Sequence, residues 1–236
     1  MKKVLFCIAF FVAYTIQGIT GFAGNIFAMP IGTALLGLNS SVAILNAMGC
    51  FACGLLAFMN LKSVDWRELG IIIAGMIPFM LLGIWLDTLI EVPMLLRIFG
   101  ITIVIVGVYN LVKHEERTLP KPVLWLALAL AGLIQGMFVS GGAFLVIYAI
   151  QRVPDKQRFR ATLSMVWAIL NLLYMVISYH AGYYTSDVLW VVLACIPISV
   201  AATVLGNRLQ KALSQERFLK VTYVLLVVIG AVLLIR

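Results

Sequence analysis

Long apolar runs are the feature that most restricts how this chain can fold. The runs IIIAGMIPFMLLGIWL (71–86) and VTYVLLVVIGAVLLI (221–235) carry no charged residue, and about 20 such residues in a helix cross the hydrocarbon core of a bilayer. Membrane barrels are built instead from short strands of alternating hydrophobicity. Of the 236 residues, 64% are hydrophobic and 11% are charged, whereas soluble domains carry about 25% charged residues. The sequence therefore predicts an all-α, polytopic membrane protein embedded in the lipid bilayer.

The net charge of +8 is explained by the membrane rather than by nucleic acid. The Lys and Arg residues lie between the apolar runs, where cytoplasmic loops of membrane proteins carry them. No nucleic-acid partner is therefore expected.

Cys50 and Cys53 form a CxxC pair without a second pair or a nearby His, so helix packing is favoured over a metal site. No metal and no other cofactor are predicted.

The two halves of the chain resemble each other at an offset of 118 residues. The stretch IQGITGFAG (16–24) falls on IQGMFVSGG (134–142), and both interrupt long apolar segments. Matching pairs at this offset and at slightly larger offsets are Gln17 and Gln135, Gly18 and Gly136, Gly24 and Gly142, Ile77-Pro78 and Ile196-Pro197, and Leu82-Gly83 and Leu205-Gly206. Two related units therefore cover nearly the whole chain.

Each unit is predicted to contain four apolar segments, of which the first is broken by its glycines. The first unit, 1–112, has a hairpin at 4–37 and helices at 42–60, 69–87 and 94–112. The second unit, 123–236, has a hairpin at 123–151 and helices at 160–180, 187–206 and 217–235. A cytoplasmic linker at 113–122 joins the two units.

The distribution of Lys and Arg residues indicates how these segments cross the membrane. If each broken segment is a hairpin that returns to its starting side, only Lys2, Lys3, Arg97 and Arg236 of the 17 Lys and Arg residues lie opposite the rest. If each broken segment crosses instead, the division is about even, against the positive-inside rule. A hairpin followed by three crossings makes the two units inverted repeats. Many secondary transporters have this design, with paired broken segments at the substrate site.

The chemistry of the breaks favours an anion as the small-molecule partner. All nine Asp and Glu residues lie in loops or at segment ends, which argues against a carrier that binds cations or protons through buried carboxylates. The glycine breaks would expose backbone N–H groups at helix N-termini, where anions bind, and glycine lets a small anion approach the backbone closely. The breaks are therefore predicted to bind the substrate.

One face of the helix at 160–180 is a second candidate element. Its members are Arg160, Ser164, Trp167, Asn171, Tyr174 and Ser178, matched in the first unit by Val42, Asn46, Gly49, Cys53, Leu56 and Asn60. Spacings of three and four residues place each set on one side of its helix, and both faces are expected to look toward the breaks. In the alternative interpretation, Ser and Asn only link helices, at about 1 kcal/mol each, and Arg160 is a cytoplasmic anchor.

The predicted substrate-binding set combines both elements. Its residues are Gln17, Gly18, Gly21, Gly24, Asn25, Asn46, Gln135, Gly136, Ser140, Gly141, Gly142, Arg160, Ser164 and Asn171.

The motifs at these positions are similar to those of a known family. With QGITGFAGNIFAMP (17–30) and AILNAM (43–48) in the first half, and QGMFVSGG (135–142) and RATLSM (160–165) in the second, the chain resembles the sulfite exporter TauE/SafE family over almost its full length. The resemblance implies a multi-pass permease of the cell membrane for sulfite, sulfonates or related sulfur-containing or organic anions. Asn25 and Asn46 depart from the family pattern, which commonly has Gly and a hydroxyl residue there.

The predicted function is secondary transport of a small anion. An integral-membrane enzyme is one alternative, but it needs a nucleophile, a metal cluster or an acid–base pair at membrane depth. The sequence shows no HExxH motif, no buried carboxylate pair and no clustered His, so no enzyme activity is expected. An anion channel is the other alternative. The sequence also leaves open whether the chain forms a homo-oligomer.

Overall fold

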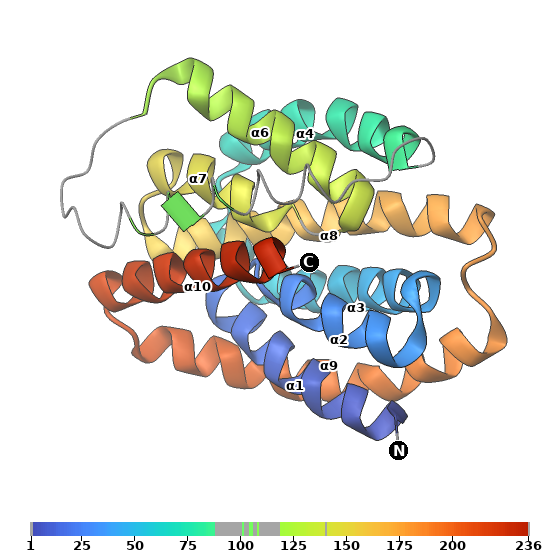
Figure 1. Cartoon of the computed structure of the whole chain (residues 1–236). Coiled ribbons are helices and arrows are strands. Elements are labelled where there is room, and N and C mark those ends of the chain that lie inside the picture. Colours follow the sequence, from blue (N-terminus) through green and yellow to red (C-terminus); the bar gives the residue numbers. More distant parts are fainter. Residues whose placement is uncertain are drawn as a thin grey trace. The chain divides into compact units, whose positions relative to one another are not determined.

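The protein is helical throughout the part that the structure describes. The computed structural model describes residues 2–87, 101, 104, 105, 108, 119–139 and 141–235, and Figure 1 traces them. The helices of the first half are α1 (Lys2–Thr20), α2 (Gly24–Leu36), α3 (Leu38–Met59), η1 (Leu61–Ser63) and α4 (Trp66–Asp87). Those of the second half are α6 (Lys121–Phe138), α7 (Gly142–Arg152), α8 (Lys156–His180), α9 (Ser186–Ala212) and α10 (Gln215–Ile235). The all-α prediction is confirmed.

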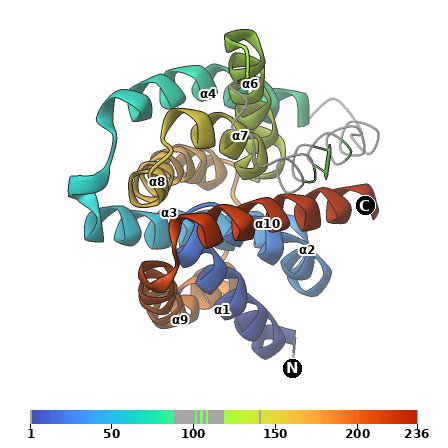
Figure 2. The ribbon, with the colours of Figure 1, turned by 90° about the vertical axis from the view of Figure 1, so that its left-hand side faces the viewer.

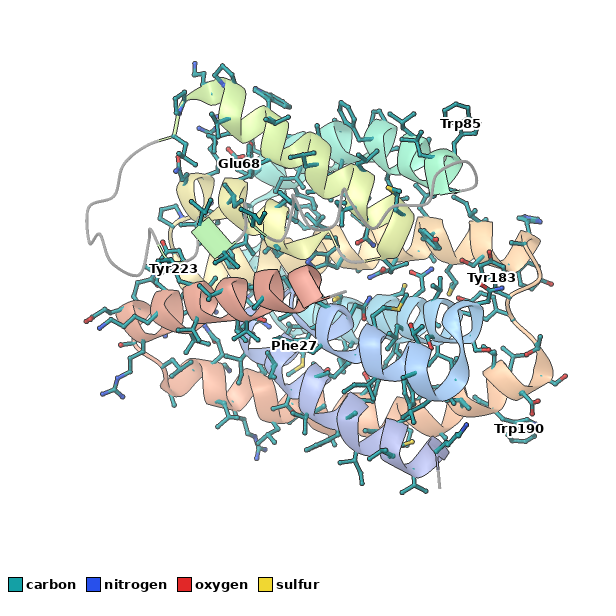
Figure 3. All side chains as sticks on the ribbon, in the orientation of Figure 1. Phe27, Glu68, Trp85, Tyr183, Trp190 and Tyr223 are labelled. Atoms are coloured by element: carbon teal, nitrogen blue, oxygen red, sulfur yellow. The ribbon has the colours of Figure 1, made fainter. Side chains whose placement is uncertain are left out.

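Helix length separates two kinds of apolar element. The segments Asn39–Met59, Trp66–Leu86, Lys156–His180 and Ser186–Ala212 are long and apolar enough to cross a membrane, whereas Val4–Thr20, Gly24–Leu36, Lys121–Met137 and Gly142–Arg152 have 10–17 residues. Seventeen residues make about 25 Å of helix, less than the roughly 30 Å of hydrocarbon core. Large apolar side chains point outward, as Trp85 and Trp190 do in Figure 3 (59% and 71% exposed). The chain is therefore a polytopic membrane protein, as predicted.

Several helix ends differ from the prediction. Helix α9 continues to Ala212, although the sequence predicts a loop after 206, and α8 begins at Lys156 rather than at 160. Both extensions are rich in polar residues, which continue a helix beyond the hydrocarbon region. A single residue, Gly37, separates α2 from α3.

The predicted helix at 94–112 lies outside the described residues except for 101, 104, 105 and 108, which are helical. Most of the linker at 113–122 also lies outside them.

The chain folds into two compact units, and each unit combines both halves of the sequence. Unit 1 comprises Met1–Ile73 and Gln157–Ala212, and unit 2 comprises Ala74–Lys156 and Leu213–Arg236. Unit 1 thus joins α1, α2 and α3 to α8 and α9, whereas unit 2 joins most of α4 to α6, α7 and α10. Within unit 1, α1 packs against α9, and the two helices are neighbours in both views (Figures 1 and 2). The sequence repeats are therefore not themselves the compact units.

The same backbone contact occurs in each unit at repeat-related positions. In unit 1, a β-carbon on Gly206 of α9 would lie 2.5 Å from the carbonyl oxygen of Thr15 and 2.6 Å from the Cα of Gly18, both in α1. In unit 2, a β-carbon on Gly83 of α4 would overlap the carbonyl oxygen of Leu133 in α6. Gly83 matches Gly206, and Leu133 matches Thr15. The sequence repeat thus recurs in the packing, while the inversion of the second half stays a prediction.

Side-specific labelling tests the inverted topology. The hairpin arrangement predicts that the segments 60–68, 113–122, 151–160 and 207–217 all face the cytoplasm, with both termini outside. In a variant lacking the four native cysteines, Lys62→Cys and Lys156→Cys should both react with an impermeant thiol reagent in inside-out vesicles and neither in right-side-out vesicles. Reaction of the two positions from opposite faces would contradict the inverted repeat.

Candidate functional site

The first glycine break packs against the N-terminal part of α8. Helix α1 ends at Thr20 and α2 begins at Gly24. Between them Gly21 has a φ of 86°, a left-handed conformation that glycine adopts at little cost. A β-carbon on Gly21 would lie 3.0 Å from Cγ and 3.1 Å from the carbonyl oxygen of Arg160. The structure therefore brings together the break and the first residue of the predicted α8 face.

The second break repeats the backbone geometry of the first. Helix α6 ends at Phe138 and is followed by Val139, the counterpart of Gly21, with a φ of 51°. The N–H of Val139 donates to the carbonyl oxygen of Gln135 at 3.0 Å, as that of Gly21 does to Gln17 at 2.6 Å. The left-handed conformation costs about 1–2 kcal/mol for a residue other than glycine. Ser140, which is in the predicted set, lies outside the described residues.

A buried glutamine lies at each break. The side-chain oxygen of Gln135 accepts a hydrogen bond from the N–H of Gly141 at 3.2 Å. The side-chain amide of Gln17 donates to Sγ of Cys53 at 2.7 Å, and a β-carbon on Gly24 would lie 2.8 Å from the Cβ of Gln17. In this conformation both glutamines therefore hold the chain together around the breaks, although the sequence predicts them as substrate ligands.

The remaining predicted glycines of unit 2 have packing contacts. A β-carbon on Gly136 would lie 2.9 Å from the backbone nitrogen of Ile84 in α4, and one on Gly141 would lie 3.1 Å from the Cβ of Gln135. Gly142 is buried as the first residue of α7. Packing therefore requires a small residue at Gly136 and at Gly141, as is common where membrane helices approach each other closely.

Both predicted helix faces are buried. On α8 this holds for Arg160, Ser164, Trp167, Asn171, Tyr174 and Ser178. On α3 it holds for Val42, Asn46, Gly49, Cys53 and Leu56, and it also holds for Asn60, which directly follows α3. The helical spacing read from the sequence therefore identified the inward sides of both helices.

Three asparagines and a tyrosine form a buried polar cluster in unit 1. With the Asn46 amide oriented so that both of its ends are satisfied, Nδ2 donates to Oδ1 of Asn171 at 3.0 Å. A β-carbon on Gly49 would lie 2.9 Å from Nδ2 of Asn171 and 3.1 Å from Nδ2 of Asn25. The hydroxyl of Tyr14 donates to Oδ1 of Asn25 at 2.8 Å. The sequence did not single out Tyr14. Mutual hydrogen bonds explain how these amides are accommodated at membrane depth.

Ser164 has no hydrogen left to donate to a ligand in this conformation. Its hydroxyl donates to the carbonyl oxygen of Arg160 at 2.7 Å, a bond within its own helix that Ser often makes. A serine hydroxyl has one hydrogen, so Ser164 could contact a ligand only as an acceptor. This hydrogen bond favours a structural role for Ser164 over a role in substrate binding.

Arg160 is a buried cation without a carboxylate partner among the described residues. Its side chain is 1% exposed. Nη1 donates to the carbonyl oxygen of Gly18 at 2.8 Å, Nη2 donates to Oδ1 of Asn207, and Nε is buried without a described partner. Arg158, two residues earlier, is by contrast 56% exposed and pairs with Asp65 at 2.8 Å. Gly18 lies in the last turn of α1, where the helix dipole supplies only part of an elementary charge.

Four polar residues of α9 were not predicted from the sequence to be part of the site. Ser199, Thr203, Asn207 and Gln210 are all buried, and their spacings of four, four and three residues place them on one side of the helix. The prediction ended this helix at 206 and so placed Asn207 and Gln210 in a loop. The spacing itself was the available signal. The side-chain nitrogens of Gln210 and of Trp167 on α8 also lack a partner among the described residues.

Comparison with known proteins identifies the family. The family described as "Sulfite exporter TauE/SafE" matches residues 5–233. The chain belongs to this family. As a TauE/SafE member it is a multi-pass membrane transporter of anions, and the resemblance read from the glycine motifs is confirmed.

Two curated relatives of this TauE/SafE member are named as transporters. The "Probable inner membrane transporter protein TsaS" of Comamonas testosteroni is 27% identical over 179 residues, which are 73% of each chain. The "Probable sulfite/organosulfonate exporter TauE" of Cupriavidus necator is 23% identical over 234 residues, which are 93% of this chain and 88% of the relative. No solved structure gives a significant match.

Proposed function

We propose that this family member carries sulfite, an organosulfonate or a chemically similar anion across the membrane, with Arg160 as the fixed positive charge of its site. The observation that carries this proposal is the burial of Arg160 without a carboxylate among the described residues. Burying an unpaired charge costs several kcal/mol, and ionisable residues at membrane depth commonly mark a transport pathway. A bound anion would supply the missing negative charge.

The unpartnered donors on α8 support an anion rather than a cation. Nε of Arg160 and Nε1 of Trp167 are both buried without a described partner, and the two residues lie two turns apart on one face of α8. Guanidinium and indole N–H groups can only donate hydrogen bonds. Their natural partners are therefore acceptor oxygens. Sulfite and sulfonate groups each have three such oxygens.

The positions of the acidic residues support the same choice. The described Asp and Glu residues are Asp65, Glu68, Asp87, Asp155, Asp187 and Glu216, and each lies in a loop or in the first or last turn of a helix. A cation carrier commonly places a carboxylate in the interior of the bundle. The buried polar side chains of unit 1 are one guanidinium, amides, hydroxyls and the carboxylate of Glu68, and Glu68 lies in the first turn of α4 rather than in the middle of a helix.

Uptake into proteoliposomes tests the proposed function. We expect saturable uptake of methanesulfonate and sulfite and no uptake of sodium or potassium, with protein-free liposomes as the control. Because Arg160 stays protonated and methanesulfonate stays ionised, uptake of methanesulfonate should change by less than about twofold between pH 6 and pH 8. Uptake of sulfite, which loses its second proton near neutral pH, should follow the ionisation of sulfite itself.

The form of the concentration dependence separates the alternatives. Saturation of the initial rate indicates a carrier, whereas a rate that stays proportional to concentration indicates an anion channel. Failure of every tested sulfur oxyanion to enter the liposomes would reject the proposed substrate class. Uptake of cations would reject Arg160 as the charge that determines selectivity.

A further inference from the structure

The buried polar stripe of α9 is defined by Ser199, Thr203, Asn207 and Gln210. The polar side chains of Thr203 and Asn207 are not needed for the packing of that helix. Gly18 of α1 approaches Thr203, since a β-carbon on Gly18 would lie 3.2 Å from the carbonyl oxygen of Thr203. The repeat-related glycine of α6 contacts the carbonyl oxygen of Met80 in α4 in the same way. At this register Met80 matches Thr203, and Ile84 matches Asn207. The same close contact is therefore made in unit 2 with apolar side chains.

Arg160, like Asn207, has an apolar counterpart in the other half of the chain. Its counterpart is Val42, which is buried on α3. The cation on α8 and the amide of Asn207 on α9 thus occur together in one half and are both replaced by apolar residues in the other. A role that only one half performs, such as binding of a charged group, explains this asymmetry better than helix packing does.

Two buried donors without described partners belong to the two helices that the Arg160–Asn207 hydrogen bond joins. On α8, Nε of Arg160 is free of partners among the described residues, and on α9 the same is true of Nε2 of Gln210. Gln210 is 2% exposed and Arg160 is 1% exposed. Gln210 lies one helical turn beyond Asn207 and on the same side of α9. Buried donors in native proteins are nearly always paired, so both point to a ligand with several acceptor oxygens.

We infer that Gln210 binds the substrate directly and that Asn207 is a positioning residue that orients Arg160. This inference rests on the proposed function and deepens it. Nε and one hydrogen of Nη2 can bind two oxygens of an anion side by side, as guanidinium groups do. Nε2 of Gln210 then donates to a third oxygen. A sulfonate or sulfite group offers that third oxygen and a carboxylate does not, so Gln210 selects for three-oxygen anions.

The variant Gln210→Met tests the direct contact, because Met has a similar length and no donor. In proteoliposomes, the KM for methanesulfonate should rise about tenfold, as expected when a hydrogen bond to a charged group is lost. The KM for acetate should stay unchanged, so the preference for methanesulfonate over acetate should fall by the same factor. Gln157→Met, at an exposed position at the start of α8, is the matched control and should leave both values at the wild-type level.

The variant Asn207→Asp tests the positioning role with two readouts that should move in opposite directions. A carboxylate at 207 would lie against Nη2 of Arg160 and give the buried guanidinium a counter-ion. The melting temperature of the purified protein should rise, while methanesulfonate binding should weaken more than tenfold because the internal carboxylate competes with the substrate. A rise in melting temperature with unchanged methanesulfonate binding would mean that Arg160 only caps the end of α1, and it would overturn the inference.

The outcomes separate this inference from the proposed function. If wild-type protein transports no sulfur oxyanion, both fail. If wild-type protein transports methanesulfonate and Arg160→Gln does not, but Gln210→Met keeps the wild-type KM and selectivity, the proposed function stands and the inference about Gln210 is wrong. If Gln210→Met does not fold, Gln210→Asn keeps an amide but withdraws it from the substrate. It should show the same loss of preference for methanesulfonate over acetate, and an unchanged preference would likewise overturn the inference.

Discussion

Arg160→Gln is expected to reduce methanesulfonate uptake at least about 100-fold while leaving folded protein in the membrane. The substitution removes the buried positive charge and two hydrogen bonds to a charged partner, which together contribute about 3 kcal/mol to anion binding, and each 1.4 kcal/mol is a factor of ten. Gln is uncharged and its amide nitrogen ends two bonds short of Nη1, so the carbonyl oxygen of Gly18 loses its donor but no unpaired charge stays buried. Initial uptake rates should be normalised to the monodisperse protein recovered by size-exclusion chromatography.

Arg158→Gln is the matched control for this prediction. Arg158 is 56% exposed and pairs with Asp65, and it lies about 200° around the helix from Arg160. Such an exposed ion pair contributes at most about 1 kcal/mol to stability, so uptake should change by less than about twofold. Arg160→Lys should recover part of the lost uptake, because Lys keeps the charge but not the planar fork. Equal, small losses in Arg160→Gln and Arg158→Gln would return Arg160 to the role of a topological anchor.

The breaks and the inward helix faces could be predicted because they leave local marks in the sequence. Glycine at 21 is favoured by a left-handed backbone, and the spacing of Arg160, Trp167 and Asn171 marks one side of α8. Both signals lie within a few turns of chain. The sequence also identified Arg160 as a candidate because its repeat counterpart, Val42, is apolar.

The partners of Arg160 could not be predicted in the same way. Asn207 was missed because hydropathy shows where a helix leaves the hydrocarbon region rather than where the helix ends, and α9 continues to Ala212. The proximity of Gly18 to Arg160 depends on a contact between residues 142 positions apart, and no local pattern encodes that contact. The hydrogen-bond partner of Ser164 could not be predicted either, since only the structure shows that its hydroxyl donates within its own helix.

The assembly of each compact unit from both halves depends on a few glycines, whose signal is ambiguous in sequence. Gly206 and Gly83 match each other, but glycine in a membrane helix is equally consistent with a kink, a break or a close contact. Only the structure shows that Gly206 contacts the backbone of α1 and that Gly83 contacts the backbone of α6. The repeat was therefore readable from sequence, while the exchange of helices between the halves was not.

Gly206→Ala should lower the stability of the protein by about 3 kcal/mol, seen as a large drop in melting temperature in detergent. A β-carbon at 206 would lie 2.5 Å from the carbonyl oxygen of Thr15 and 2.6 Å from the Cα of Gly18. Overpacking typically costs about 1–3 kcal/mol when side chains can adjust. Here the neighbours are backbone atoms of α1, so no rotamer change relieves the overlap and the cost lies at the upper end of that range.

Two further variants show whether this loss comes from the backbone contact. Gly54→Ala on α3 is the control, because a β-carbon there meets nothing within 4 Å and the higher helix propensity of Ala should stabilise the helix by about 1 kcal/mol. Gly83→Ala should lower the melting temperature as Gly206→Ala does, since its β-carbon would overlap the carbonyl oxygen of Leu133 in α6. Because Gly83 and Gly206 are repeat-related, similar losses would show that both units depend on the same contact. A wild-type melting temperature for Gly206→Ala would mean that α1 and α9 do not approach each other this closely.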